Sequence, residues 1–200
     1  MRSPIDFYFD FGSPYGYFAS LHIEKVAAQA GREIRWHAIL LGPIFKQTNG
    51  APLTTLPVKG NYSVHDMKRT ARFHNILFRF PDVFPIGTQH AARAVLWAQQ
   101  HAPDKAVTLI HTLFSAYFTE NIDISKAETV VRIAVDLGLP QEALAAGIGD
   151  EAIKNGLKEA VDTAFQRGVF GSPFVIVDDE QFWGFDRFDQ LASFLKNGKI

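Results

Sequence analysis

The stretch FYFDFGSPYGYFASL, residues 7–21, decides how the fold begins. The segment Ile5–Phe11 is mostly apolar and aromatic, as is typical of a largely buried strand. Pro14 then suits the first turn of a helix, which we expect to end at Gly31. Ser13 therefore stands at a helix N-terminus, where unpaired N–H groups favour a nearby anion.

Strand signals occur near both ends of the chain. The short, β-branched and aromatic segment Glu33–Leu40 predicts a second strand, parallel to the first through a right-handed crossover. Near the other end we expect strands over Phe174–Val177 and Gln181–Trp183, joined by a tight turn at Asp178-Asp179, and a closing helix over Asp186–Lys196. The four strands together predict one mixed sheet.

The middle of the chain has a different character. Three prolines, three glycines and no periodicity mark Gly42–Gly60 as a long loop. Helices are predicted over Tyr62–Asn75, Gln89–His101, Asp104–Thr119, Ser125–Leu137 and Asp150–Arg167. Asp104 and Ser125 are the expected N-caps of their helices.

Composition excludes several classes of function. The chain has 200 residues, 47% of them hydrophobic, and a net charge of -1, which gives no broad electrostatic case for nucleic acid or an anionic membrane. It has no cysteine, which excludes disulfides, cysteine-zinc sites, iron–sulfur clusters and cysteine nucleophiles. The first residues show no leader and no stretch has 18 consecutive apolar residues, so we expect a soluble, cytoplasmic protein.

Each of the two Ser-Pro pairs permits both a structural and a functional interpretation. Ser13 could be an ordinary N-cap, a role that serine fills in many helices. The second pair places Pro173 at the start of a strand, where a trans bond is common. A cis bond would instead turn the peptide groups of Ser172 outward, for pairing with an extended ligand. The sequence leaves both alternatives open.

The segments DFYFDFGSPYGYFAS and GVFGSPFVIVDDEQFWGFDRF, separated by many helices, carry a family resemblance. The chain resembles the 2-hydroxychromene-2-carboxylate isomerases and kappa-class glutathione transferases, relatives of the DsbA oxidoreductases. The resemblance implies an α/β fold, with a thioredoxin-like mixed four-stranded sheet and a large inserted all-helical domain. Residues 1–60 and 168–200 would form the discontinuous thioredoxin-like domain, and residues 61–167 the helical domain.

The resemblance also implies a glutathione site. Oxidoreductases of this fold carry Cys-x-x-Cys where this chain has Ser13-Pro14-Tyr15-Gly16, so dithiol redox chemistry is excluded. The hydroxyl of Ser13 would instead hold the thiolate of bound glutathione, whose free thiol has a pKa of about 8.5. The resemblance places the remaining cofactor contacts on Ser172, Pro173, Trp183, Gly184, Phe185 and Asp186. Asp186 would bind the ammonium of the γ-glutamyl end, and it could also serve as a helix N-cap.

Candidate substrate residues come from the resemblance as well. Lys46 matches a substrate-binding lysine of the isomerases, and its cation would suit an aromatic carboxylate. Phe84 matches a pocket position, with Asn61, Lys59 and Arg69 as further polar candidates. Each has a structural alternative, because Lys46 could be a solvated surface charge and Phe84 a core residue.

We therefore expect a glutathione-dependent isomerase of the 2-hydroxychromene-2-carboxylate type, from the catabolism of aromatic compounds. The alternatives are a kappa-like transferase or peroxidase and a non-catalytic thioredoxin-fold binding or chaperone module. The partners would be an aromatic carboxylate or another electrophile and a second copy in a homodimer, without nucleic acid or membrane. The seven histidines show no metal-ligand spacing, so no metal is expected.

Overall fold

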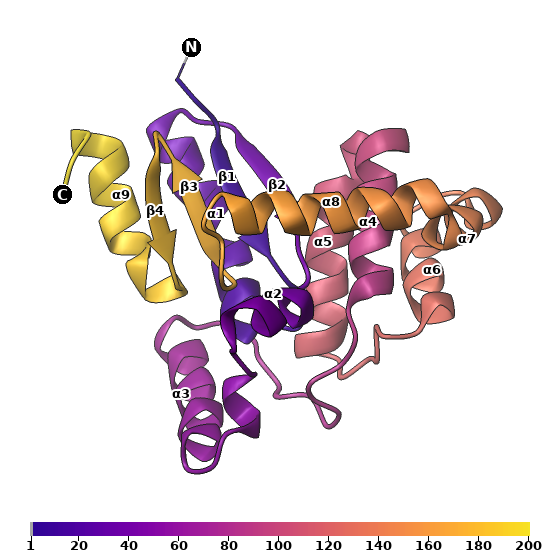
Figure 1. The fold of residues 1–200 in the computed structure, drawn as a ribbon, viewed down its shortest axis with the longest axis horizontal. Coiled ribbons are helices and arrows are strands. Elements are labelled where there is room, and N and C mark those ends of the chain that lie inside the picture. The colour runs from indigo at the N-terminus through magenta and orange to yellow at the C-terminus, as the bar shows by residue number, and fades with distance from the viewer. Residues whose placement is uncertain (1) are drawn as a thin grey trace.

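A four-stranded sheet lies at the centre of the protein (Figure 1), for which a computed structural model describes residues 2–200. Its strands are β1 (Ile5–Phe9), β2 (Ile34–Ala38), β3 (Phe174–Val177) and β4 (Glu180–Trp183), in the order β2-β1-β3-β4. β1 pairs parallel with β2 and antiparallel with β3, which pairs antiparallel with β4. The predicted mixed four-stranded sheet is confirmed.

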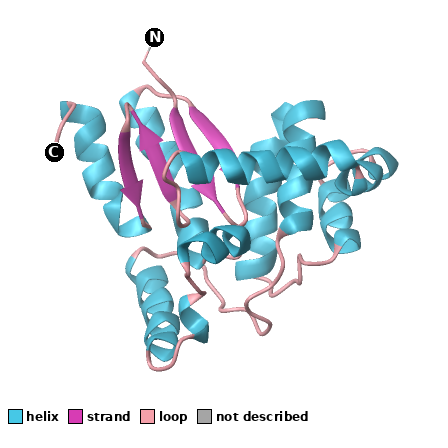
Figure 2. Cartoon of the chain, in the orientation of Figure 1, coloured by secondary structure: helices cyan, strands magenta, loops and turns pink. Residues whose placement is uncertain are grey.

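Helices make up most of the remaining chain (Figure 2). They are α1 (Pro14–Ala30), α2 (Leu41–Thr48), α3 (Lys59–Phe73), α4 (Gln89–His101), α5 (Pro103–Phe118), α6 (Ala127–Asp136), α7 (Gln141–Gly149), α8 (Glu151–Gln166) and α9 (Phe188–Asn197), with 3-10 turns η1 (Leu53–Thr55) and η2 (Phe185–Arg187). In Figure 1, α8 crosses in front of the sheet, α1 lies behind it and α4–α7 form a block at one side. α3 lies below the sheet, apart from that block. Within residues 2–200, the structure has no helix that is long and apolar enough to span a bilayer.

The two aspartates that interrupt the aromatic run around β1 each have polar partners in the folded protein. Phe9 faces an aromatic core, where its ring centre lies 5.7 Å from that of Phe114 on α5. Asp6 faces the opposite side, where it lies 2.9 Å from Arg167 at the end of α8 and 2.9 Å from His37 on β2. Burial opposes ionisation of Asp6, but these two partners hold its pKa below its ordinary value. Asp6 therefore links the C-terminal end of α8 to the sheet. The second aspartate, Asp10, belongs to the candidate functional site.

The predicted loop over residues 42–60 is wrong in most of its length, because α2, η1 and the start of α3 lie within it. Pro43 is compatible with the first turn of α2, where no intrahelical N–H bond is lost. The N–H of Leu41 donates to the Asp10 carboxylate at 2.6 Å, so a distant residue stabilises the start of this helix. Asp10 lies 31 residues before Leu41, so the sequence around α2 alone does not reveal this partner. Helix α7 was also not predicted.

Several predicted helix starts shift in the structure. Asp104 is not an N-cap, because Ala102 takes that position and Pro103 the first helical one. Ser125 is not one either: its N–H donates to Asp123 at 2.9 Å, and α6 starts only after Lys126. At α5 the helix begins one residue earlier than predicted, directly after Ala102, whereas at α6 a turn around Ser125 delays the first helical residue.

The closing helix also starts later than expected. α9 begins at Phe188 rather than Asp186, because the 3-10 turn η2 precedes it. Asp186 therefore lies within η2 and makes no side-chain cap there. The predicted turn between β3 and β4 is confirmed at Asp178 and Asp179, which both have positive φ.

Candidate functional site

Ser13 is the N-cap of α1, as the structural interpretation predicts. Its Oγ accepts the N–H of Gly16 at 3.0 Å, and its main-chain oxygen accepts the N–H of Tyr17 at 3.0 Å. The Ser13 hydroxyl donates in turn to the main-chain oxygen of Ser172 at 2.7 Å, across 159 residues of sequence. The two Ser-Pro pairs thus meet at one point, where Ser13 is only 6% exposed.

The second Ser-Pro pair has the cis geometry that the sequence left open. The Ser172-Pro173 peptide bond is cis. The Ser172 hydroxyl accepts the N–H of Asp10 at 2.9 Å, so the turn before β3 is tied to the end of β1. The Ser172 carbonyl accepts the Ser13 hydroxyl, and it belongs to the peptide group that was predicted to pair with an extended ligand.

Gly16 allows the two pairs to approach each other. A Cβ atom at Gly16 would lie 2.8 Å from Ser172 Oγ and 3.1 Å from Ser13 Cβ. Alanine is favoured over glycine in a helix by about 1 kcal/mol, yet we expect Gly16→Ala to lower the free energy of unfolding by about 1–3 kcal/mol. Urea denaturation measures this change. The control is Gly42→Ala on α2, where a Cβ meets nothing within 4 Å and a small gain in stability is expected. A gain in both variants would show that the close approach is not needed.

Asp10 connects three segments of the site, and no role was predicted for it from the sequence. Its carboxylate accepts the N–H of Gly12 at 2.8 Å, the N–H of Leu41 at 2.6 Å and the hydroxyl of Thr88 at 2.7 Å. Burial raises the pKa of Asp10, and these three donors oppose that effect. Asp10 thereby joins the Ser13 turn to the starts of α2 and α4. The available signal was an acidic residue at the end of an otherwise aromatic strand, directly before the turn.

The first turn of α1 leaves one main-chain donor for an anion. Pro14 has no N–H, and the N–H of Gly16 is taken by Ser13 Oγ. Within residues 2–200, the N–H of Tyr15 has no hydrogen-bond acceptor. An anion beside Ser13 could therefore accept from the Tyr15 N–H and, after the hydroxyl turns away from Ser172, from Ser13 as well.

The C-terminal cofactor candidates lie next to the cis-proline strand. The N–H of Gly184 donates to the main-chain oxygen of Pro173 at 3.1 Å, and φ of Gly184 is +103°, a value that glycine adopts readily. The Asp186 carboxylate is 73% exposed and lies 3.4 Å from Arg187. The Trp183 ring is 55% exposed. Phe185 is buried, so its side chain is closed to a ligand.

The substrate candidates are distributed over three segments. Lys46 is exposed on α2, the helix whose first N–H is tied to Asp10. Lys59 and Asn61 are exposed in the first turn of α3. Phe84 is half-buried and packs on the core, with its ring centre 6.5 Å from that of Tyr117, which favours the core interpretation.

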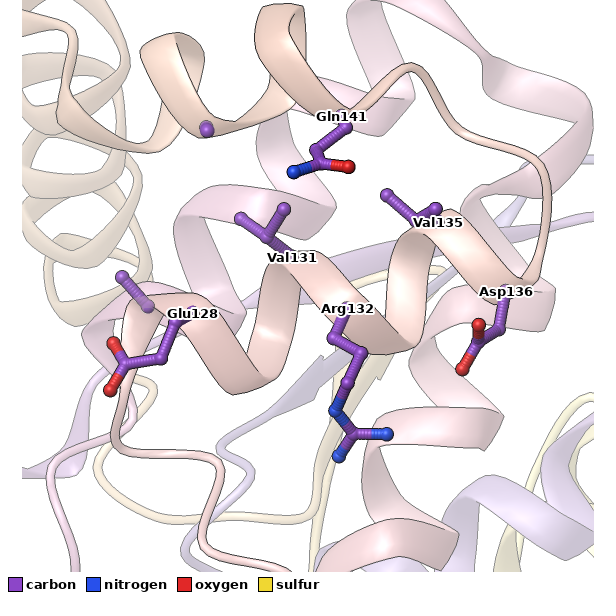
Figure 3. A pocket seen from close by; sticks show the side chains of 8 residues that line it. Glu128, Val131, Arg132, Val135, Asp136 and Gln141 are labelled. Atoms are coloured by element: carbon purple, nitrogen blue, oxygen red, sulfur yellow. The ribbon is translucent and has the colours of Figure 1, made fainter.

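A shallow hollow of about 470 Å³ lies elsewhere, between α6 and α7 (Figure 3). Val131 and Val135 of α6 point toward Gln141 of α7, and Glu128 and Arg132 also line the hollow. None of the predicted site residues lines it. In the described part of the chain, no three His, Cys, Asp or Glu side chains are placed to hold a metal ion.

The sheet order, the cis-proline before β3 and the capped start of α1 define a thioredoxin-like protein without the usual cysteines. A family model described as a DSBA-like thioredoxin domain matches residues 4–196. The chain therefore belongs to the DsbA-like thioredoxin family, and within it to the 2-hydroxychromene-2-carboxylate isomerases and their kappa-class relatives.

Two sequence relatives and one solved structure carry this assignment. The 2-hydroxychromene-2-carboxylate isomerase of Sphingobium xenophagum is 30% identical to this chain, in an alignment that covers 98% of this chain and 99% of the isomerase. Glutathione S-transferase kappa 1 of Caenorhabditis elegans is 26% identical and covers 96% of this chain and 90% of its own length. A solved 2-hydroxychromene-2-carboxylate isomerase superposes with a TM-score of 0.86 at 28% identity, covering 96% of this chain and 94% of that structure. The chain is thus an enzyme of an isomerase or transferase type.

Proposed function

We propose that this protein is a glutathione-dependent isomerase that acts on 2-hydroxychromene-2-carboxylate or a related aromatic carboxylate. The observation that carries the proposal is the meeting of Ser13, at the start of α1, with the cis Ser172-Pro173 bond. A buried hydroxyl at a helix N-terminus is suited to stabilising a thiolate. Because the chain has no cysteine, that thiolate must belong to a bound molecule.

The residues around Ser13 fit a bound glutathione. Gly16 allows the two Ser-Pro pairs to lie close together. The sulfur would accept from the N–H of Tyr15 and, after the hydroxyl turns away from the Ser172 carbonyl, from Ser13. The Ser172 main chain would pair with the cysteinyl part. The exposed carboxylate of Asp186 would take the γ-glutamyl ammonium, with the Gly184 and Phe185 main chain beside it.

The bound thiol would supply a nucleophile that adds reversibly to the conjugated substrate, permits ring opening and rotation, and leaves again. The chain's own part is to bind both molecules side by side, which provides the proximity effect. Ser13 would lower the thiol pKa, and each unit of lowering corresponds to about 1.4 kcal/mol. Lys46 would hold the substrate carboxylate, since it lies on the helix tied to Asp10.

Lys46 gives a prediction for substrate choice. We expect Lys46→Gln to raise KM for 2-hydroxychromene-2-carboxylate about three-fold, because an exposed ion pair to the substrate carboxylate is lost. KM for the uncharged electrophile chlorodinitrobenzene should stay the same. Steady-state kinetics with both compounds measures the difference, and Lys158→Gln on α8 is the matched control. A rise of KM for both compounds would argue against a carboxylate contact.

A kappa-like glutathione transferase or peroxidase is the second candidate, because the same Ser13 chemistry serves both outcomes. Calorimetric titration with glutathione, followed by assays on 2-hydroxychromene-2-carboxylate and chlorodinitrobenzene, separates the two. Isomer formation without consumption of glutathione supports the isomerase, and a stable conjugate supports the transferase. Absence of binding at millimolar glutathione would reject both and leave a binding or chaperone module.

Four further proposals accompany this function. The protein would act as a homodimer in the cytoplasm, and its pathway would be the degradation of aromatic compounds. Residues 61–167 would form the helical domain inserted into the thioredoxin-like domain. Analytical ultracentrifugation tests the dimer.

A further inference from the structure

Tyr15, two residues after Ser13, links α1 to α3. Its half-buried hydroxyl donates to the Asp66 carboxylate on α3. Asp66 also forms an ion pair with Arg69 one turn later. Arg69 donates to the Tyr62 hydroxyl at 3.0 Å and lies 5.7 Å from the centre of its ring. Arg69, a substrate candidate from the sequence, is therefore engaged within α3.

The charges of this group suit a bond between a neutral phenol and a carboxylate. Burial and the neighbouring Asp66 raise the pKa of Tyr15, so its hydroxyl keeps its proton near neutral pH. Burial opposes ionisation of Asp66, but its bonds from Tyr15 and Arg69 hold its pKa below the ordinary value. Hydrogen bonds to a charged acceptor are stronger than bonds between neutral groups.

Few buried apolar side chains hold α3 in place. Its buried residues are Gly60, Ser63, Met67 and Ala71, whereas Phe73 is 79% exposed. The residue before the helix, Val58, is 87% exposed and has φ of +64°, which is strained for a β-branched residue. In Figure 1 the helix lies away from the α4–α7 block.

The two ends of α3 are held differently. At its C-terminal end, His74 packs against Phe185, with ring centres 4.7 Å apart. At its N-terminal end the helix follows η1, whose Thr54 carbonyl closely faces Gly60. Between them, the Tyr15–Asp66 bond is a polar tie to the helix that carries Ser13. The first turn of α3, with Lys59 and Asn61, is thus fixed relative to Ser13 partly through Asp66.

We propose that Asp66 is a positioning residue, which acts through Tyr15 to fix α3 beside the Ser13 end of α1 and so completes the binding site of the electrophile. The inference rests on the proposed function. Ser13, Ser172 and Asp186 lie outside α3. Loss of the tie should therefore impair use of the electrophile and spare the binding of glutathione.

Steady-state kinetics tests whether loss of the Tyr15–Asp66 bond impairs use of the electrophile and spares the binding of glutathione. Tyr15→Phe removes the donor and keeps the ring, and Asp66→Asn removes the charge. We expect each variant to raise KM for the electrophile about ten-fold, with the dissociation constant of glutathione and the pKa of its bound thiol unchanged; this corresponds to about 1.4 kcal/mol. Asp66→Glu should restore part of the loss.

The matched control is Asp82→Asn. Asp82 pairs with Arg79 at 3.0 Å with the same spacing of three residues, but both side chains are exposed and lie outside α3. This variant should leave the KM for the electrophile unchanged. Equal effects of Asp82→Asn and Asp66→Asn would overturn the inference, as would an unchanged KM in both Tyr15→Phe and Asp66→Asn.

Hydrogen exchange tests the role of the Tyr15–Asp66 bond without any measurement of enzyme turnover. Amides of α3 should exchange about ten-fold faster in Tyr15→Phe than in the wild type, while those of α5 should keep their rates. If the wild type fails to bind glutathione, the proposed function fails, and exchange still decides the positioning role. Equal exchange of α3 in both proteins would overturn that role.

Discussion

We expect the Ser13→Ala variant to lose glutathione-dependent turnover by a factor of about 100–1000, the range found when one preorganised donor is removed from an active site. The variant lacks the hydroxyl that would donate to the thiolate, so the bound thiol should be mostly protonated at neutral pH. Loss of the N-cap should cost about 1 kcal/mol of stability, which leaves the protein folded. Steady-state kinetics, together with urea denaturation, separates the two effects.

Ser20→Ala is the control for Ser13→Ala. Ser20 lies on the same helix, is fully buried and donates to the Tyr17 carbonyl at 2.7 Å. Its removal should change stability by a comparable amount and leave turnover near the wild-type value. If the two variants lose activity equally, the loss comes from α1 as a whole and not from the Ser13 hydroxyl. Full activity in Ser13→Ala would reject the proposed activation of the thiol.

Asp10→Ala should have the largest effect on stability, and we expect it to lower the free energy of unfolding by about 3–5 kcal/mol. The substitution leaves the N–H of Leu41 and the hydroxyl of Thr88 without their buried acceptor, and it frees the N–H of Gly12. Each unsatisfied buried donor costs about 1–3 kcal/mol. Urea denaturation measures the change.

Two further variants test the role of Asp10. Thr88→Val removes one of the three donors and should cost only about a third as much as Asp10→Ala. Asp162→Ala replaces an exposed aspartate on α8 and should change stability by less than about 0.5 kcal/mol. An effect of Asp10→Ala as small as that of Asp162→Ala would contradict the view that Asp10 joins α2 and α4 to the Ser13 turn.

The strands and the two ends of α1 could be predicted because their signals are local. The aromatic run before Ser13 is long, and Pro14 and Gly31 mark the two ends of α1. The same holds for the turn at Asp178-Asp179, where short polar residues with positive φ separate two strands. The resemblance to a known family added the order of the elements.

The parts that could not be predicted depend on contacts between distant residues. The helix over Leu41–Thr48 was predicted as a loop because its first N–H is satisfied by Asp10, 31 residues earlier. The role of Asp10 itself depends on Thr88, 78 residues later. The bond between Ser13 and the Ser172 carbonyl exists only once β1 and β3 have paired.

The central claim is that Ser13 stabilises the thiolate of bound glutathione. The most direct measurement is a pH titration of the ultraviolet absorbance of that thiolate, in the wild type and in Ser13→Ala. We expect an apparent pKa at least about one unit below 8.5 in the wild type and a value nearer to 8.5 in the variant, which keeps only the Tyr15 N–H and the helix N-terminus. The same pKa in both proteins would contradict the claim.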